Sequence, residues 1–91
     1  MSALPENVTA YKRTPTFDAT TLPGALRNDH ATKAGVWGLI HVEAGRLSYQ
    51  ISDTGAAIEL AAGDMTGVIE PQVRHRVTPI GHVRFYVEFY R

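Results

Sequence analysis

The 91-residue sequence predicts an all-β domain of mostly antiparallel strands, a sandwich or a barrel. From Val36 onward, short runs rich in branched and aromatic residues recur at roughly 8–12-residue spacing and end at Gly, Pro or Asp. Because such tight turns join antiparallel neighbours, the sheet should be largely antiparallel. No segment combines a helical hydrophobic period with helix caps, so we expect close to no helix.

Residues 1–29 are expected to form an arm that packs on the body of the domain. Pro5, Pro15 and Pro23 interrupt any regular run, and a cluster of threonines favours extended or turn backbone. One or two short strands are expected here, with Val8–Arg13 as the main candidate.

The body of the domain is expected to consist of short strands joined by turns. Alternation with polar residues is clearest at Leu47, Tyr49 and Ile51, a half-buried pattern. Gly45 and Gly55 are expected to supply turns between strands. The expected strands are Val36–Glu43, Arg46–Ser52, Ala57–Leu60, Met65–Ile69, His75–Thr78 and Val83–Tyr90.

Composition excludes several classes of function. Lys plus Arg and Asp plus Glu both number 9, so the formal net charge is zero. Proteins that bind nucleic acid or anionic membranes usually carry a basic excess, so neither partner is expected. The sequence has no cysteine, which excludes disulfides, thiolate metal sites and a cysteine nucleophile. With neither a signal-peptide pattern nor an apolar run of about 20 residues, we expect a cytoplasmic domain.

The remaining candidates for chemistry are four histidines and nine carboxylates. His75 shares strand parity with Val77, which points it inward, and a buried imidazole needs hydrogen bonds or a metal ion for its ring nitrogens. A single inward histidine is more often a hydrogen-bonded core residue than a ligand. His41 shares parity with Trp37 and is expected to be packed or exposed, and His82 should lie exposed in a turn.

Two segments, His30–Gly38 and Glu70–Val77, resemble the tellurite-resistance-like group of small cupin domains, the TehB-like and YeaR-like family. The arm motif Tyr11–Pro15 and the Gly63–Asp64 turn fit the same pattern. The resemblance implies one cupin-like domain over residues 1–91, folded as a double-stranded β-helix, or jelly-roll barrel. Such a barrel often binds one divalent metal ion.

The resemblance also implies a set of metal ligands. His75 matches the histidine of the second cupin motif, and His30 lies near the histidines of the first. The usual His-x-His pair is reduced to His30, and Gly38 stands near the usual glutamate. The missing ligands could come from Glu70, which lies at a strand end five residues before His75, or from Glu88. Imidazoles with carboxylates suit Zn, Fe, Mn or Ni and leave positions open for water or substrate.

The remaining candidate residues have both a functional and a structural interpretation. Glu88 lies on the strand face of Tyr86, so a solvated carboxylate is the alternative for it. Lys33, Trp37 and Arg74 are expected to lie near the cavity entrance and to bind a small-molecule or oxyanion ligand. A solvated rim for the two cations, and ordinary packing for the tryptophan, are the alternatives.

The expected function is binding of a divalent metal ion and a small, possibly anionic, ligand in a tellurite-resistance or stress-response module. Methyltransferase activity is not expected, because the chain lacks a Gly-rich cofactor turn and the length for a doubly wound sheet. One alternative is a metal-dependent oxygenase or isomerase, for which no catalytic residue is assigned. The other is a domain without metal that works through homodimerisation. A homodimer is the expected assembly, and the aromatic last strand could provide its interface.

Overall fold

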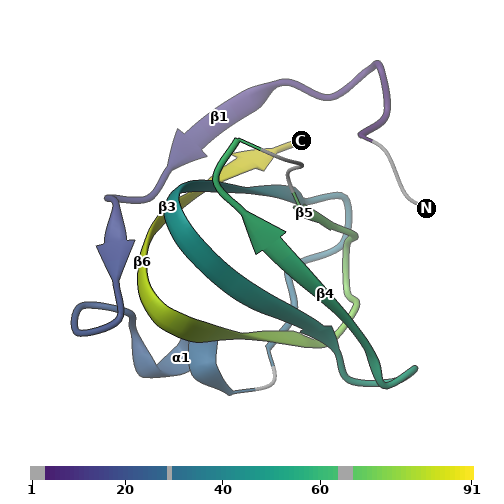
Figure 1. Ribbon diagram of the computed structural model, residues 1–91. Helices are drawn as coiled ribbons and strands as arrows, with labels where there is room; N and C mark the ends of the chain where they lie inside the picture. The colour runs from purple at the N-terminus through teal and green to yellow at the C-terminus, as the bar shows by residue number, and fades with distance from the viewer. Residues whose placement is uncertain (1–3, 29, 64–66) are drawn as a thin grey trace.

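The computed structural model describes residues 4–28, 30–63 and 67–91 (Figure 1). All strand pairs in this part of the chain are antiparallel, as predicted, and the only helix in it has four residues. None of its helices has the length and apolar character needed to cross a membrane. The elements are β1 (Ala10–Arg13), β2 (Phe17–Asp18), α1 (Gly24–Arg27), β3 (Trp37–Ile51), β4 (Ala56–Ala61), β5 (Gly67–Ile69) and β6 (His75–Tyr90).

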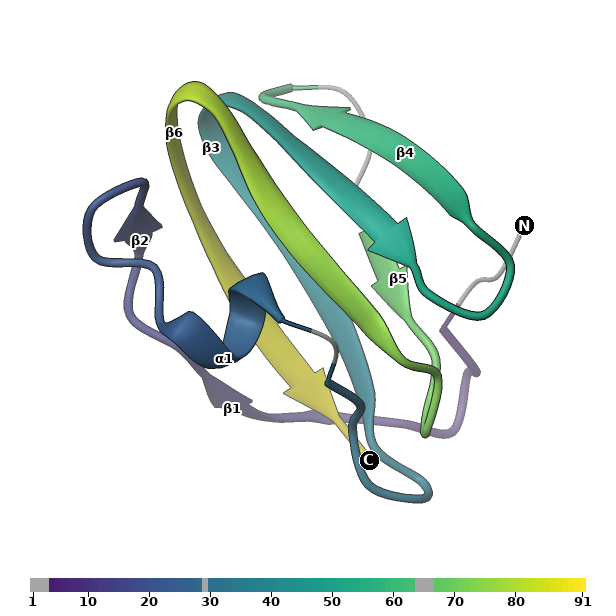
Figure 2. The same ribbon diagram turned by 90° about the horizontal axis from the view of Figure 1, so that it is seen from below.

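Two long strands, β3 and β6, form the centre of the sheet and curl together around the interior (Figures 1 and 2). Their register runs from Trp37 opposite Tyr90 to Ile51 opposite His75. On the far side of β6 lie β1 and β2, and on the far side of β3 lie β4 and β5. The strand order β1-β6-β3-β4 leaves the sheet open, so the closed jelly-roll barrel is not seen.

The predicted strands were too short at two places. Val36–Glu43 and Arg46–Ser52 are one continuous strand, β3, and Gly45 lies inside it with a φ of 75°. The register shifts on both sides of Gly45, which is the mark of β-bulges. A Cβ at Gly45 would lie 1.8 Å from the carbonyl oxygen of His82, so only glycine permits this close approach of β3 and β6.

The last two predicted strands are likewise a single element. Both His75–Thr78 and Val83–Tyr90 belong to β6, because Pro79 stays in the ladder opposite Leu47. Glycine and proline therefore bend the long strands here without ending them.

The shorter elements lie close to their predicted positions. Strand β1 begins at Ala10, two residues later than expected, and β4 extends one residue beyond each predicted end. Of the predicted strand Met65–Ile69, the structure describes Gly67–Ile69 as β5, and Met65 lies outside the described residues.

The core lies on the concave face of the sheet. Alternation along the strands places it there, and His75, 1% exposed, is the one polar residue in the described chain that is equally buried. Burial of each large apolar side chain contributes about 1.5–3 kcal/mol to stability. The core residues are Leu22, Ile40, Leu47, Tyr49, Leu60, Ile69, Val77, Val83, Phe85 and Val87.

Candidate functional site

Two of the predicted site residues, His30 and His75, lie side by side. His75 is the first residue of β6, and His30 lies in the loop after α1. The two residues pair as an isolated antiparallel bridge. The His30 amide donates to the His75 carbonyl at 3.0 Å, and the His75 amide donates to the His30 carbonyl at 2.9 Å. The centroids of their rings are 4.1 Å apart, with the planes inclined at 59°.

The loop that carries His30 is tied to the turn before β6. The Thr32 hydroxyl donates to the Val36 carbonyl at 2.7 Å, which closes the loop on itself. The Gln72 amide donates to the Thr32 carbonyl at 3.1 Å. Gln72 has a φ of 63°, a left-handed conformation that costs free energy in a residue with a side chain. The two histidines therefore sit on segments held by several backbone contacts.

Hydrogen bonds to the backbone define which ring nitrogen carries the proton. Nδ1 of His30 lies 3.1 Å from the Asn28 carbonyl, and Nδ1 of His75 lies 2.9 Å from the Val73 carbonyl. Because a carbonyl oxygen only accepts, each Nδ1 must be the donor. In a neutral ring, Nε2 then keeps an unshared electron pair. Nε2 of His75 is buried and has no hydrogen-bond partner among the described residues.

The surroundings keep the His75 ring neutral. Burial lowers the pKa of His75, and the neighbouring His30 lowers it further, against the opposing effect of the Val73 carbonyl. Tyr49 packs edge-on against the His75 ring, at 5.6 Å and 72°. Burial, with a smaller effect of Glu70, raises the pKa of Tyr49 to about 12, so this phenol is neutral as well.

A cavity of about 190 Å³ lies beside the two imidazoles. The arm contributes Thr14 and the helix α1 contributes Leu26 to its wall. Its polar members are His30, His75 and two threonines, and no charged side chain of the described residues lines it. The apolar part of the wall includes Leu26, Ile40, Ile69, Val77, Phe85 and Phe89.

Glu88, one of the expected metal ligands, lies on the outer face of the sheet. Its Oε1 atom is 2.6 Å from Nε2 of His41, although the two groups are not aligned as a hydrogen bond. The His41 ring in turn stacks on Tyr86, with centroids 4.7 Å apart. This is the face that strand alternation predicted for Glu88, and it is opposite to the face of His75.

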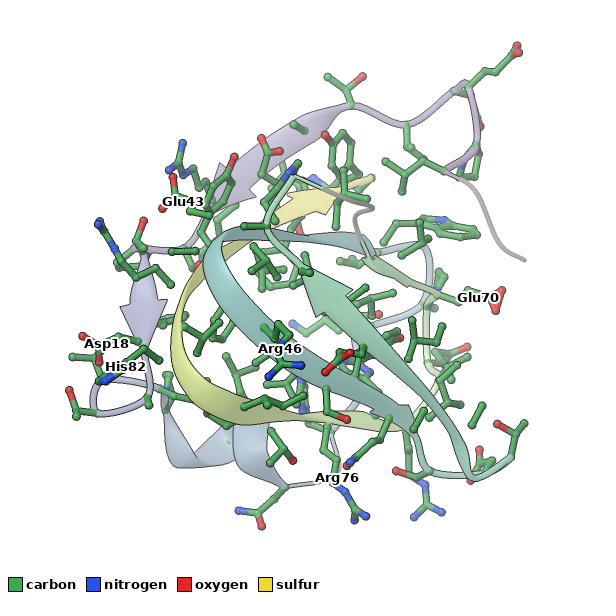
Figure 3. The ribbon with its side chains drawn as sticks, viewed as in Figure 1. Asp18, Glu43, Arg46, Glu70, Arg76 and His82 are labelled. Carbon is green, nitrogen blue, oxygen red and sulfur yellow. The ribbon has the colours of Figure 1, made fainter. Side chains whose placement is uncertain are left out.

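Glu70 does not line the cavity, and its side chain points away from the body of the domain (Figure 3). Within residues 4–28, 30–63 and 67–91 no group of three or more His, Asp or Glu side chains could hold a metal ion. Catalytic zinc sites have three protein ligands and structural sites have four. The structure thus brings together two of the four expected ligands, and this pair alone does not make a complete protein site for a resident metal ion.

The three expected ligand-binding residues lie away from the cavity wall. Lys33 is exposed in a turn, and Trp37 stands on the outer face opposite Tyr90. Arg74 is exposed and pairs with Asp53 at 3.0 Å. The sequence missed Leu26, whose only signal was an apolar residue within the Pro-rich arm, and Thr14 and Thr32, for which there was no signal.

A second hollow, of about 470 Å³, lies near His82, which is exposed (Figure 3). Asp18 at its edge accepts hydrogen bonds from the amides and hydroxyls of Thr20 and Thr21. The Thr20 hydroxyl has the largest part in lowering the pKa of Asp18 to about 2. This carboxylate is therefore used by its own turn, and we assign no site here.

Together the fold and the site define a small antiparallel β-domain with an apolar, histidine-walled cavity. Residues 12–87 match the TehB-like domain model, so the chain belongs to the TehB-like domain family. The crystal structure of TehB from Haemophilus influenzae is similar, with a TM-score of 0.85 and 27% sequence identity. That match covers 93% of this chain and 32% of TehB, so the chain spans about a third of the length of TehB.

Two further crystal structures show likeness of fold alone. A protein from Escherichia coli strain K12 gives a TM-score of 0.88 at 23% identity, covering 100% of this chain and 97% of its own. A protein from Neisseria meningitidis gives a TM-score of 0.58 at 12% identity, and the match covers 98% of this chain and 87% of that protein. No curated protein sequence matches the chain significantly.

Proposed function

We propose that this domain binds a small, mainly apolar molecule in the cavity and accepts a hydrogen bond from it at Nε2 of His75. The observation that carries the proposal is the buried Nε2 atom without a partner in the cavity wall. A buried polar group left unpaired costs about 1–3 kcal/mol. A ligand with one hydrogen-bond donor would recover much of that cost.

The volume and charge of the cavity narrow the class of ligand. An engineered apolar cavity of about 150 Å³ is known to bind benzene. At about 190 Å³, this cavity suits a molecule with one ring or a comparable aliphatic group and one polar substituent. A charged anion would lose its hydration without gaining a cation, since no charged side chain of the described residues lines the wall. The favoured ligand is a neutral donor, such as a phenol or a protonated acid.

The cupin-like character of the domain and its role in tellurite resistance, both implied by the sequence resemblance, belong to this proposal. In such a role, the apolar wall would favour a protonated oxyacid over its charged form. Because the chain spans about a third of TehB, the proposal concerns what this domain binds and assigns it no reaction.

A divalent metal ion is the second candidate ligand, and the orientation of the imidazoles favours it. Metal-ligating histidines commonly donate their other ring N–H to a carbonyl, as both Nδ1 atoms do here. His30 and His75 would hold Zn, Fe, Mn or Ni through Nε2, and water or the small ligand would complete the coordination. Glu70 and Glu88, where they lie, would not contribute.

A titration with three one-ring probes tests the proposal. We expect phenol to bind about 3- to 10-fold more tightly than toluene, which has the same shape but no donor. Benzoate should bind least at neutral pH, because it is charged. Amide chemical shifts of Val77 and Val87, which line the cavity, would report binding there. No binding of any probe, or tightest binding of benzoate, would contradict the proposal.

Two variants separate the small molecule from the metal ion. His75→Phe keeps a ring in place but removes the acceptor, so it should still bind toluene and lose the preference for phenol. If the metal is the ligand, purified protein should hold it at near one equivalent, and the double variant His30→Ala/His75→Ala should hold none. His82→Ala, at an exposed histidine, is the matched control and should behave as the parent.

A further inference from the structure

The strand β4 forms an open edge of the sheet (Figure 2). On one side it pairs with β3 over its whole length, from Ala56 opposite Ile51 to Ala61 opposite Arg46. No described strand pairs with its other side, so that side presents unpaired backbone N–H and C=O groups. Backbone groups in this arrangement bind another extended strand.

The two edges of the sheet differ in how they are protected. At the opposite edge, β1 carries the charged residues Lys12 and Arg13 and has a bulge in its register. The guanidinium carbon of Arg91 lies over the Tyr11 ring, 4.1 Å from its centroid. Charges and bulges are the usual devices that prevent edge-to-edge pairing. Strand β4 has no proline or bulge, and its single charge, Glu59, is paired with Arg46 at 3.2 Å.

The exposed apolar residue of β4 lies on the core side of the sheet. Ile58 pairs with Tyr49, which is buried, yet the Ile58 residue itself is 41% exposed. A strand added beyond β4 would extend the concave face and cover this side chain. The occupant therefore needs an apolar residue opposite Ile58.

A second copy of β4 meets this requirement. In an antiparallel pair, two residues directly opposite each other are either both hydrogen-bonded to the other strand or both not. When the two strands are copies related by a two-fold axis, this holds only if one residue lies on the axis, opposite its own copy. Centring the axis on Glu59 would oppose two carboxylates, which is unfavourable. Centring it on Ile58 places Ile58 opposite Ile58, Ala57 opposite Glu59 and Ala56 opposite Leu60, with no like charges facing.

We propose that two copies of this chain pair antiparallel through β4, with Ile58 at the two-fold axis. The sequence suggested a dimer through the last strand, which is β6. In the structure β6 pairs with β1 and β2 on one side and with β3 on the other, so neither of its backbone edges is free for another strand. A six-residue edge belongs to the small, weakly bound class of interface, so the dimer forms in a concentration-dependent equilibrium.

Single cysteines test this pairing directly, because the natural chain has none. Ile58→Cys places each thiol opposite its own copy, within reach of a disulfide. Under mild oxidation we expect it to form a covalent dimer at least 10-fold faster than Tyr11→Cys. Tyr11 is the matched control, since it is 42% exposed and lies on the protected edge.

Sedimentation equilibrium of the unmodified chain provides the second measurement. We expect a monomer–dimer equilibrium that Ile58→Lys abolishes and Tyr11→Lys leaves unchanged, with circular dichroism showing that both variants are folded. Equal crosslinking rates of the two cysteine variants would overturn the proposal. A parent chain that stays monomeric at millimolar concentration, or a dimer insensitive to Ile58→Lys, would overturn it as well.

Discussion

Burial of His75 among apolar side chains links the protonation of one imidazole to the stability of the fold. Burial lowers the pKa of His75 in the folded chain below its ordinary value of 6.5. As the pH falls through 6.5, the unfolded chain therefore takes up a proton first. The stability that the neutral ring contributes is present above pH 6.5 and is lost as the pH falls toward the pKa of the folded state.

We accordingly expect His75 to make the domain less stable at pH 5 than at pH 7.5. The melting temperatures of the parent, His75→Phe and His82→Ala at the two pH values test this. His82→Ala should lose as much stability on acidification as the parent, and His75→Phe should lose less. A parent and His75→Phe with the same pH dependence would show that His75 is not the linked group.

The left-handed backbone at Gln72 is a second feature at the scale of one residue. Gln72→Gly removes the steric cost of a φ of 63° and should raise the free energy of unfolding by up to about 1 kcal/mol. Chemical denaturation measures the change. Thr78→Gly is the control, because Thr78 lies exposed in β6 with an ordinary φ. This variant should lower the free energy of unfolding by about 1 kcal/mol. Destabilisation by both changes would mean that Gln72 carries no strain.

At the scale of elements, the bulges at Gly45 allow β3 and β6 to remain paired while they curl. Gly45→Ala forces a Cβ against the carbonyl oxygen of His82 and should cost about 3 kcal/mol or more. Gly55→Ala has a similar φ, 72°, but no atom within 4 Å of the new Cβ. It should cost only about 1–2 kcal/mol, the cost of the left-handed conformation. Equal losses in urea denaturation would contradict this account of the bulge.

Strand type could be predicted from the sequence, but strand length could not. Alternation of apolar residues depends on local pattern, and it correctly placed Leu47, Tyr49 and Val77 on the core face and His41 on the other. Whether a glycine ends a strand or bends it depends on the partner strand. At Gly45 the partner strand is β6, whose His82 carbonyl oxygen comes too close to leave room for a side chain. No local sequence pattern reveals this close approach.

At the scale of the whole molecule, the candidate site was only half predictable. His30 and His75 were found because the motif resemblance marked both, and the structure places their rings in contact. Glu70 was a candidate because it lies close to His75 in the sequence, and the fold directs its side chain outward. Glu88 lies on the outer face, as strand alternation indicated. The cavity wall combines the arm, α1, β3, β5 and β6, an assembly that only the tertiary structure reveals.

The most direct test of the account is the protonation state of the His75 ring, read from its two nitrogen chemical shifts by long-range ¹H–¹⁵N NMR at pH 7.5. We predict a proton on Nδ1 and none on Nε2 in the free protein, because Nδ1 donates to the Val73 carbonyl. Saturation with phenol should shift Nε2 as it accepts a hydrogen bond and leave Nδ1 protonated. A proton on Nε2 of the free protein, with Nδ1 bare, would contradict the proposed site.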